Sequence, residues 1–436
     1  MEKNKMIAIV VVVVLIAAGV GMYLAFGNTP SEYRSANTDG RLAILGNADE
    51  NDYLDDADLK KIDEMIKDKK YSNMADANND GVVDAKDKEM VQSMIDIKKY
   101  NKDKKDSEKK TMTVNYIGVD KDILSGKYPV NKIIISGTQR SLGLAIAIGA
   151  GDRVVALNDY VFQYWDENFF KAYKNLPSIG DRKTPDLEAT MQISADTIYA
   201  GSVSKYAVNI PENVLGSKQV LRMVSYEDGR LAEGALMLGF FTDNDAGAQK
   251  YVKWMDDTMK AVNDKLSKVK DPAATRFYLG TPTYMYAQLD GVSTAFTNSK
   301  ATNIGNIIVT NPTAAGMSTS KCMEDIEKQN PGYIIGGKYM YTQNTFDEVK
   351  AVYNGMDWSK FAITDAVKNN NIYMVNYDLP FCIHTYIACS IFFPDQFSQD
   401  DLTKMITDYL KNFTEAGDYE FKLYHFLFTP EDAKTA

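Results

Sequence analysis

The stretch from Asp245 to Val269, DAGAQKYVKWMDDTMKAVNDKLSKV, carries the clearest structural signal in the chain. Its apolar residues recur three or four positions apart, and they are Ala248, Tyr251, Val252, Met255, Met259, Val262, Leu266 and Val269. This spacing predicts one helix with a continuous apolar stripe. Asn244 or Asp245 can cap its start, and Pro272 ends it. At 1.5 Å per residue the predicted helix is roughly 38 Å long, enough to cross a small domain.

Similar sequence patterns lie on the two sides of this helix. LEATMQISADTIYAG begins at Leu187, and MEDIEKQNPGYIIGG begins at Met323. In each, a glutamate opens a short amphipathic helix, a small residue or proline follows seven positions later, and a β-rich strand ends in glycine. The pattern predicts an internal duplication, with Glu188 and Glu324 at equivalent points of two similar lobes.

Strand and helix patterns alternate in both halves of the chain beyond residue 111. The predicted strands are 130–135, 153–157, 196–200 and 220–225, followed by 275–279, 333–335 and 371–375. The predicted helices are 140–150, 231–241, 346–353, 383–393 and 400–413. Such alternation is typical of a parallel sheet covered on both faces. The sequence therefore predicts an α/β fold with two Rossmann-like lobes, joined by the long helix.

Composition excludes several classes of protein. The chain has 436 residues and a net charge of -10, which would repel a nucleic acid. The three cysteines form no disulfide framework, and Cys382 and Cys389 either pair or lie buried as thiols. Neither His384 nor His425 lies beside a nucleophile motif, and no Walker motif, GxSxG elbow or CxxC pair occurs. The sequence therefore predicts that the protein is not an enzyme. His384 is either a helix residue whose ring is hydrogen-bonded within the protein or a metal ligand.

Residues 1–28 read as a membrane segment. Lys3 and Lys5 precede about twenty uncharged residues from Met6 to Phe26, enough to span a hydrocarbon core of about 30 Å. The lysines favour a cytoplasmic N-terminus, which places the rest of the chain outside the cell membrane. The alternative is a cleaved signal peptide, whose apolar core is usually shorter.

Two acidic loops, 29 residues apart, follow this segment. Oxygen-bearing side chains occupy positions 1, 3, 5, 9 and 12 of each loop, the pattern that Ca²⁺ requires. The predicted ligands are Asn47, Asp49, Asn51, Asp55 and Asp58 in the first loop, and Asp76, Asn78, Asp80, Asp84 and Asp87 in the second. The second loop has Gly81 for the sharp turn, where the first has Asp52. We therefore expect the first site to be weaker.

Residues 38–99, with two such loops that end in Asp and are each followed by a short helix, resemble a type I dockerin. The resemblance implies a small all-α domain that binds Ca²⁺ and docks onto a cohesin. At the usual contact positions this chain has Asp56-Ala57 and Ala85-Lys86 where the family commonly has a Ser/Thr pair. A spacer that Ca²⁺ stabilises is the alternative to a cohesin-binding domain.

Residues 100–110 are highly charged and lack branched apolar side chains, which predicts a flexible linker. The resulting domain organisation has six segments. They are a membrane anchor (1–28), the dockerin-like domain (38–99), the linker (100–110), lobe 1 (111–244), the connecting helix (245–271) and lobe 2 (272–436).

The order of motifs beyond residue 111 resembles the substrate-binding proteins of iron-siderophore, haem and cobalamin ABC importers. It runs through GAGDRVVAL, SIGDRKTPDLEATMQISADTIYAG, the long helix, MEDIEKQNPGYIIGG, WSKFAITDAVKNNNIYMVN and FFPDQF. The resemblance covers roughly residues 111–415 and implies a metal-chelate ligand and an ABC permease as partner. In this family a glutamate on each lobe pairs with arginine on the permease, and the matching positions here are Glu188 and Glu324. Helix-start capping is the alternative role for these two residues.

The ligand is expected in the cleft between the lobes, near loops at the carboxyl ends of strands. An arginine at a helix start can pair with an anionic group, and aromatic faces suit large planar ligands. The candidate ligand-binding residues are Arg140, Tyr164, Trp165, Tyr206, Tyr284 and Tyr286. Packing in the core is the alternative role for each tyrosine.

Two functions are consistent with these patterns. The first is a membrane-anchored extracellular protein that captures a metal chelate and delivers it to an ABC permease. The second is a cell-surface scaffold component, recruited through the dockerin-like domain, without a role in transport.

Overall fold

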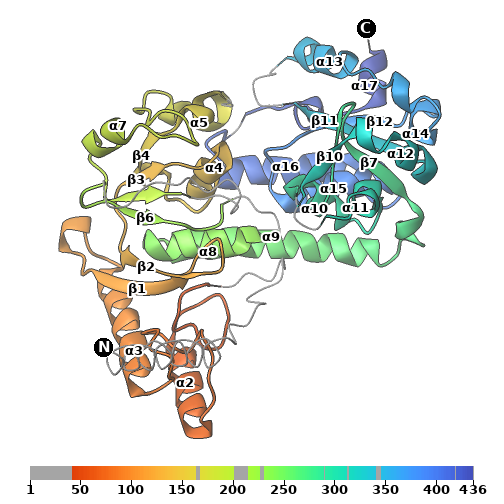
Figure 1. Ribbon diagram of the computed structural model, residues 1–436. Helices are drawn as coiled ribbons and strands as arrows, with labels where there is room; N and C mark the ends of the chain where they lie inside the picture. Colours follow the sequence, from red (N-terminus) through yellow and green to blue (C-terminus); the bar gives the residue numbers. More distant parts are fainter. Residues whose placement is uncertain are drawn as a thin grey trace, which may run out of the picture.

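The computed structural model describes residues 42–163, 167–200, 215–225, 230–288, 290–311, 314–339, 345–417 and 419–435. Two sheets with their helices lie side by side, and one long helix runs beneath both (Figure 1). A smaller helical part lies below the first sheet. The predicted membrane segment lies outside the described residues, and no helix within them is long and apolar enough to span a bilayer.

Lobe 1 contains a four-stranded parallel sheet with the order β4-β3-β5-β6. Its strands are β3 (Ile133–Ile135), β4 (Val154–Leu157), β5 (Thr197–Tyr199) and β6 (Gln219–Leu221). Its helices are α4 (Gln139–Ala147), α5 (Asp159–Gln163), α6 (Glu167–Phe170), α7 (Leu187–Gln192) and α8 (Leu231–Phe241). All three residues of β3 are fully buried, as expected for a central parallel strand covered on both faces.

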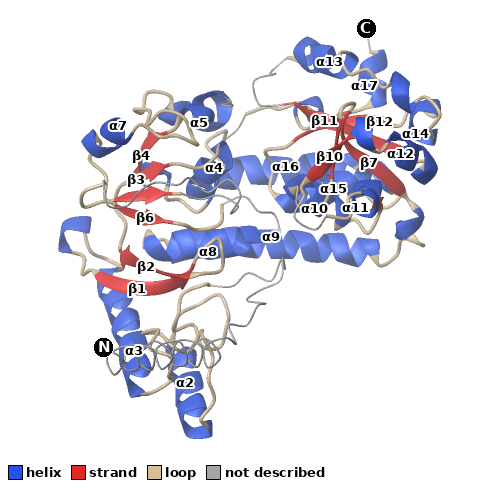
Figure 2. Cartoon of the chain, in the orientation of Figure 1, coloured by secondary structure: helices blue, strands red, loops and turns tan. Residues whose placement is uncertain are grey.

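Lobe 2 contains a seven-stranded mixed sheet. Its strands are β7 (Arg276–Thr281), β8 (Tyr284–Tyr286), β9 (Thr302–Asn303), β10 (Gly316–Ser318), β11 (Tyr333–Tyr339), β12 (Ile372–Asn376) and β13 (Leu427–Phe428). Its helices are α10 (Gly291–Thr297), α11 (Ile304–Ile308), α12 (Met323–Gln329), α13 (Phe346–Asn354), α14 (Asp365–Lys368), α15 (Phe381–Phe392), α16 (Gln399–Phe413) and α17 (Pro430–Lys434). Figure 2 shows strands and helices alternating in both lobes.

The two sheets share one strand order. In lobe 1 the strands that follow one another in the chain as β3, β4, β5 and β6 lie in space in the order β4-β3-β5-β6. In lobe 2 the parallel strands that follow one another as β7, β9, β11 and β12 lie in the order β9-β7-β11-β12, so in each sheet the first strand of the chain lies second. Strands β8, β10 and β13 are antiparallel additions to lobe 2. This correspondence is what the repeated sequence pattern around the long helix predicts.

The connecting helix α9 (Asp245–Leu266) has 22 residues, which is about 33 Å at 1.5 Å per residue. Its buried residues are Ala248, Tyr251, Val252, Met255, Met259, Val262 and Leu266, the stripe that the sequence predicts. It packs against α8 of lobe 1 and α15 of lobe 2. The helix ends at Leu266, so residues 267–271 lie outside it, although the predicted segment extends to residue 271. One continuous apolar face thus supports both lobes.

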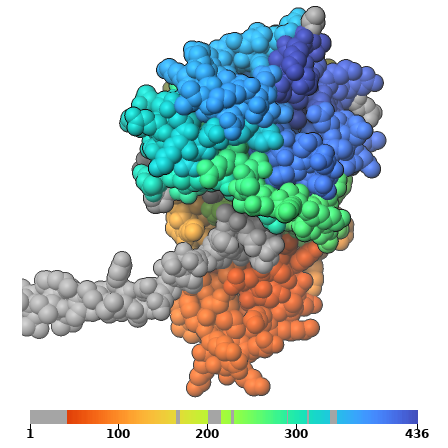
Figure 3. Space-filling model, turned by 90° about the vertical axis from the view of Figure 1, so that its right-hand side faces the viewer, coloured from red at the N-terminus to blue at the C-terminus, as the bar shows by residue number. Residues whose placement is uncertain are grey.

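The N-terminal part consists of two helices and a strand-like segment that joins a hairpin. The helices are α2 (Asp56–Asp68) and α3 (Ala85–Asn101), and the hairpin strands are β1 (Met112–Ile117) and β2 (Ile123–Tyr128). Ile44 pairs with Tyr116 in an antiparallel bridge, and the Leu45 N–H donates to the Asn115 carbonyl oxygen at 2.9 Å. We call residues 42–101 the N-terminal module; it projects below the lobes (Figure 3).

Residues 100–110 are folded, and their prediction as a flexible linker is wrong. The Asn101 side chain donates to the Lys110 carbonyl oxygen at 2.8 Å and accepts from the Lys110 N–H at 2.8 Å. Lys109 pairs with Asp243 at 2.7 Å, and both side chains are more than nine-tenths buried. The charge of Lys109 therefore forms a buried ion pair, although the composition of this segment alone indicates a solvated chain.

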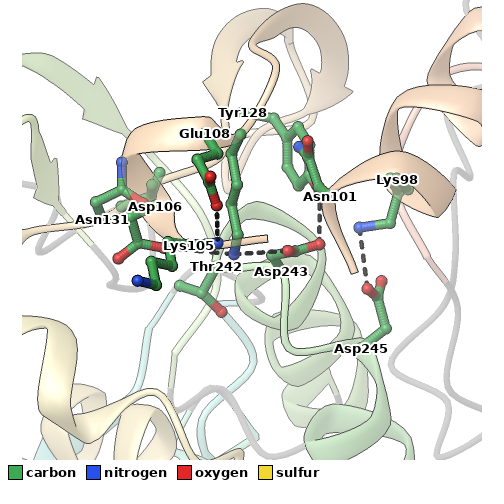
Figure 4. Close-up of polar contacts among 12 residues, drawn as sticks. Lys98, Asn101, Lys105, Asp106, Glu108, Tyr128, Asn131, Thr242, Asp243 and Asp245 are labelled. Atoms are coloured by element: carbon green, nitrogen blue, oxygen red, sulfur yellow. Dashed lines mark hydrogen bonds and ion pairs between the residues drawn. The ribbon is translucent and has the colours of Figure 1, made fainter. Parts of the chain in front are cut away.

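The same junction holds the end of α3 against the turn between α8 and α9 (Figure 4). The Lys98 Nζ lies 3.0 Å from the Asp245 Oδ2 and 4.1 Å from the centre of the Phe240 ring. The Tyr128 hydroxyl donates to the Asp243 Oδ1 at 2.5 Å. The N-terminal module is thus fixed to the first residues of the connecting helix.

Candidate functional site

A small cavity lies where the two lobes meet. It has a volume of about 50 Å³, which is room for a few water molecules. Its polar lining comes from residues beyond the carboxyl ends of β3, β6 and β12, which are Gln139, Arg140, Ser225 and Asp378. Its apolar lining includes Leu144, Phe169, Phe170, Tyr251 and Phe413. Strand ends of both lobes therefore contribute to one polar corner, as the fold class predicts.

Polar contacts join the lobes at this corner. The Gln139 Nε2 donates to the Asp378 Oδ1 at 2.7 Å, and the Arg140 Nε lies 3.7 Å from the same oxygen. The Arg140 guanidinium also donates to the Tyr377 carbonyl oxygen. The Asp378 side chain is only 3% exposed. The predicted ligand residue Arg140 is thus at the cleft, where it contacts a carboxylate of the opposite lobe.

Two predicted tyrosines approach the same corner from lobe 2. The Tyr286 ring lies 6.1 Å from the Tyr377 ring and 5.4 Å from the Tyr284 ring. Tyr284 is 38% exposed, whereas Tyr286 is partly buried. Neither lines the cavity described above. The structure therefore places Arg140 and Tyr286 against Tyr377, with Tyr284 against Tyr286. The predicted Tyr164, Trp165 and Tyr206 lie outside the described residues.

His384 is fully buried beneath this corner. Its Nε2 is 2.8 Å from the Asn376 carbonyl oxygen, and its Nδ1 has no hydrogen-bond partner among the described residues. Burial, together with the nearby Arg140 guanidinium, lowers the pKa of His384 to about 3. The imidazole is therefore neutral at physiological pH, with Nε2–H as donor. Cys382 and Cys389, on the same helix α15, are buried thiols that form no disulfide with each other, the second of the two alternatives that the sequence leaves open.

The two glutamates of the sequence repeat occupy matching places. Glu188 is the second residue of α7 and Glu324 is the second residue of α12, helices that precede the corresponding strands β5 and β11. Both side chains are exposed. Neither carboxylate forms an ion pair with another residue of the described chain. Each is therefore available to a partner at the same position on its lobe.

The closing carboxylates of the two acidic loops have the same contacts. The Asp58 Oδ1 accepts from the Asp49 N–H at 3.2 Å, and the Asp87 Oδ1 accepts from the Asn78 N–H at 3.1 Å. Both closing residues are fully buried. Burial raises the pKa of Asp58 to about 7 and also raises that of Asp87. A bound cation would offset this burial, because it stabilises the charged carboxylate.

The first positions of the loops differ. The Asp76 oxygens accept from the Asp80 N–H at 3.0 Å and from the Gly81 N–H at 2.8 Å. Asn47 donates through its Nδ2 to the Asn51 carbonyl oxygen at 2.8 Å, and its Oδ1 is buried without a hydrogen-bond partner among the described residues. An unsatisfied buried oxygen and a set of carboxylate and amide oxygens suit Ca²⁺.

The loop oxygens are hydrogen-bonded within the loops. For example, the Asn51 Nδ2 donates to the Asp49 Oδ2 at 2.8 Å, and the Asn78 Nδ2 donates to the Asp80 Oδ2 at 3.1 Å. Within the described ranges, no group of three or more His, Cys, Asp or Glu side chains is placed to hold a metal ion. The calcium assignment therefore stays a prediction that rests on the donor chemistry.

Sequence reasoning did not identify Gln139, Tyr377 and Asp378. Asp378 follows the predicted strand 371–375 by three residues, and polar residues at that place of a parallel sheet commonly face the ligand crevice. That signal was available in the sequence. The contact with Gln139, 239 positions away, was not, because local periodicity carries no information on such pairs.

Comparisons with known proteins identify the family and the fold. The family model described as periplasmic binding protein matches residues 134–378. The TroA-like periplasmic binding protein FepB of Veillonella parvula has a TM-score of 0.56 at 15% identity, over 72% of this chain and 99% of its own. MolA of Haemophilus influenzae, bound to molybdate, has a TM-score of 0.53 at 16% identity, over 70% of this chain and 99% of its own.

A third solved structure is CeuE of Helicobacter pylori in a nickel-histidine complex. It has a TM-score of 0.53 at 18% identity, over 70% of this chain and 97% of its own. At these identities the solved structures show a shared fold. No curated protein matches the sequence.

Proposed function

The chain belongs to the periplasmic binding protein family, and from that premise we propose that it captures a metal chelate and delivers it to an ABC permease. As a member of this family it is a binding protein and not an enzyme. The observation that carries the proposal is the arrangement of two sheets with one strand order on the single helix α9. Polar residues of both lobes meet at the strand ends between them.

The ligand class in this proposal is an iron-siderophore, haem or cobalamin, or a smaller metal-containing ligand. MolA binds molybdate and CeuE is in complex with nickel and histidine, so related folds hold small metal species. Tyr284 and Tyr286 supply aromatic surface on lobe 2, and Arg140 supplies a cation on lobe 1. The cavity of about 50 Å³ has room for one group of such a ligand.

Delivery to the permease uses the two exposed glutamates. Glu188 and Glu324 lie at the second residue of corresponding helices, and a carboxylate on each lobe suits a partner with two basic patches. Residues 1–28 anchor the chain in the cell membrane and keep it close to the permease. The anchor is supported by the length and charge of the apolar segment.

The N-terminal module binds Ca²⁺ through its two loops in this account. The ion would neutralise buried carboxylates such as Asp58 and Asp87 and hold the loops in shape. Because the module is fixed to the start of α9, it acts as a rigid support for the lobes. Its place below lobe 1 leaves the faces of α7 and α12 uncovered (Figure 1).

A titration tests the ligand proposal. The full chain in mild detergent is titrated with ferric siderophores, haem and corrinoids while tryptophan fluorescence is followed. Trp254 on α9 and the buried Trp358 on lobe 2 would report binding or movement between the lobes. We expect saturable binding of one ligand class with a stoichiometry of one. The absence of binding across the whole panel would refute the proposal.

A further inference from the structure

The start of α4 has the features of an anion-binding site. It combines the N-terminus of a nine-residue helix with the Arg140 guanidinium, and both favour negative charge. Ser136 and Thr138 lie in the three residues before the helix, and their buried Oγ and Oγ1 atoms have no hydrogen-bond partners among the described residues. Hydroxyl groups that lack partners in a buried place are available as donors to a bound group.

A carboxylate of the opposite lobe already lies at this site. The Asp378 Oδ1 accepts from the Gln139 Nε2 at 2.7 Å and lies 3.7 Å from the Arg140 Nε. The cavity between the lobes borders Gln139, Arg140 and Asp378. A group of a few atoms can therefore reach the same donors as the carboxylate.

Two opposite charges lie close together at this corner. Arg140 contributes one positive charge and Asp378 one negative charge, and both are largely buried. His384 contributes none, since its imidazole is neutral well below physiological pH. A second anion would therefore be repelled by Asp378 at this place, unless Asp378 moves away from Arg140.

We propose that Asp378 occupies, in the ligand-free protein, the place of an anionic group of the ligand, which displaces it on binding. This inference rests on the proposed function and narrows it to ligands that carry a carboxylate or another oxyanion group. Displacement breaks the contacts of Asp378 with Gln139 and Arg140 and replaces them with contacts to the ligand. The direct contact between Asp378 of lobe 2 and Gln139 and Arg140 of lobe 1 is thereby replaced by a contact through the ligand.

A permanent structural contact is the competing explanation, and it predicts a different response to mutation. Asp378→Asn keeps the size of the side chain and an acceptor for Gln139, but it removes the charge. If Asp378 competes with the ligand, the variant binds anionic ligands more tightly, because the competent state is no longer a minor population. If the pair only holds the lobes together, the affinity for anions stays the same or falls.

The experiment compares full-length proteins in mild detergent by calorimetry. The probes are molybdate, phosphate and ferric citrate, which separate a free oxyanion from a carboxylate carried by a chelate. We expect Asp378→Asn to raise the affinity for at least one of these probes by on the order of tenfold. Arg140→Gln should abolish binding of that probe. Thermal unfolding confirms that each variant is folded.

Glu415→Gln is the matched control. Glu415 accepts from the Tyr173 hydroxyl at 3.0 Å, a second bond between the lobes that involves neither Arg140 nor Asp378. This variant should leave the affinity for all three probes unchanged. Suppose that the protein binds a ligand of the siderophore, haem and corrinoid panel, but that folded Asp378→Asn has an unchanged or lower affinity for the three probes. That result overturns this inference and leaves the proposed function intact. Failure to bind any ligand of either panel overturns the proposed function together with it.

Discussion

Asp243→Asn should destabilise the whole chain, because it removes the buried partner of Lys109 and leaves that lysine only the half-exposed Asp106 carboxylate, at 3.4 Å. The Lys109 Nζ lies 2.7 Å from the Asp243 Oδ2, with side-chain exposures of 7% and 6%. Asparagine tolerates the left-handed backbone of Asp243, whose φ is 58°, so the change tests the charge and not the backbone. It also retains an oxygen acceptor for the Tyr128 hydroxyl.

The expected magnitude follows from burial. Removal of one partner from a buried ion pair costs roughly 3–5 kcal/mol of unfolding free energy when the other charge stays uncompensated, and Asp106 near Lys109 places the expected loss at or below the lower end of that range. The double variant Asp243→Asn with Lys109→Met should recover most of that loss, since no unpaired charge remains. Two buried groups in direct contact are expected to be non-additive in this way.

An exposed pair with the same geometry provides the control. Lys253 and Asp257 on α9 are also 2.7 Å apart, but their side chains are 75% and 64% exposed. Asp257→Asn should therefore leave the stability almost unchanged. Urea unfolding, followed by the fluorescence of Trp254 and by circular dichroism, measures each variant. If the Asp243→Asn variant is as stable as the Asp257→Asn variant, the buried junction does not contribute to stability as proposed. Separate unfolding of residues 42–101 in the unmodified chain would also refute it.

Three further predictions concern the calcium loops, the docking surface and the buried histidine. Asp76→Ala with Asp87→Ala should remove the tighter of two Ca²⁺-binding events in calorimetry, and an unaltered isotherm would contradict the loop assignment. Glu188→Ala with Glu324→Ala should abolish uptake of the ligand by cells while its affinity in solution stays intact; uptake at the normal rate would exclude the docking role. For His384, the unfolded chain binds a proton near pH 6.5, whereas the folded chain excludes it until about pH 3, so stability is fully present above pH 6.5 and falls as the pH decreases. The His384 contribution to this loss should be about 1 kcal/mol between pH 6.5 and 5.5, and it is measured as the difference in slope between the unmodified protein and His384→Gln in urea titrations, because the raised pKa of Asp58 adds a slope of opposite sign to both proteins. Equal slopes in the two proteins would show that His384 is not the titrating group.

Local periodicity was sufficient to predict the connecting helix. Seven of the eight apolar residues of the predicted stripe, from Ala248 to Leu266, are buried in α9, because a stripe three or four residues apart can only be buried as a helix. Val269 lies beyond the helix end and is only partly buried. The repeat around Glu188 and Glu324 likewise predicted two corresponding helices, since a duplicated sequence gives a duplicated local structure.

Contacts between distant residues were beyond such reasoning. Lys109 lies in a segment whose composition indicates a solvated linker, and only the fold brings it to Asp243. Asp378 and Gln139 meet for the same reason, at the edge where strands of separate lobes end. In both cases a charged or polar residue is buried because a partner far along the chain compensates it, and no local pattern contains that partner.

Hydrogen exchange with and without ligand tests the central claim that two lobes on one helix enclose the ligand. The probe is the tightest binder among the ferric siderophores, haem and corrinoids, added to the full chain. The account predicts that the ligand slows exchange at strand-end segments of both lobes, 136–140 and 376–380, and leaves residues 42–101 unchanged. Protection confined to a single lobe, or to residues 42–101, would contradict it.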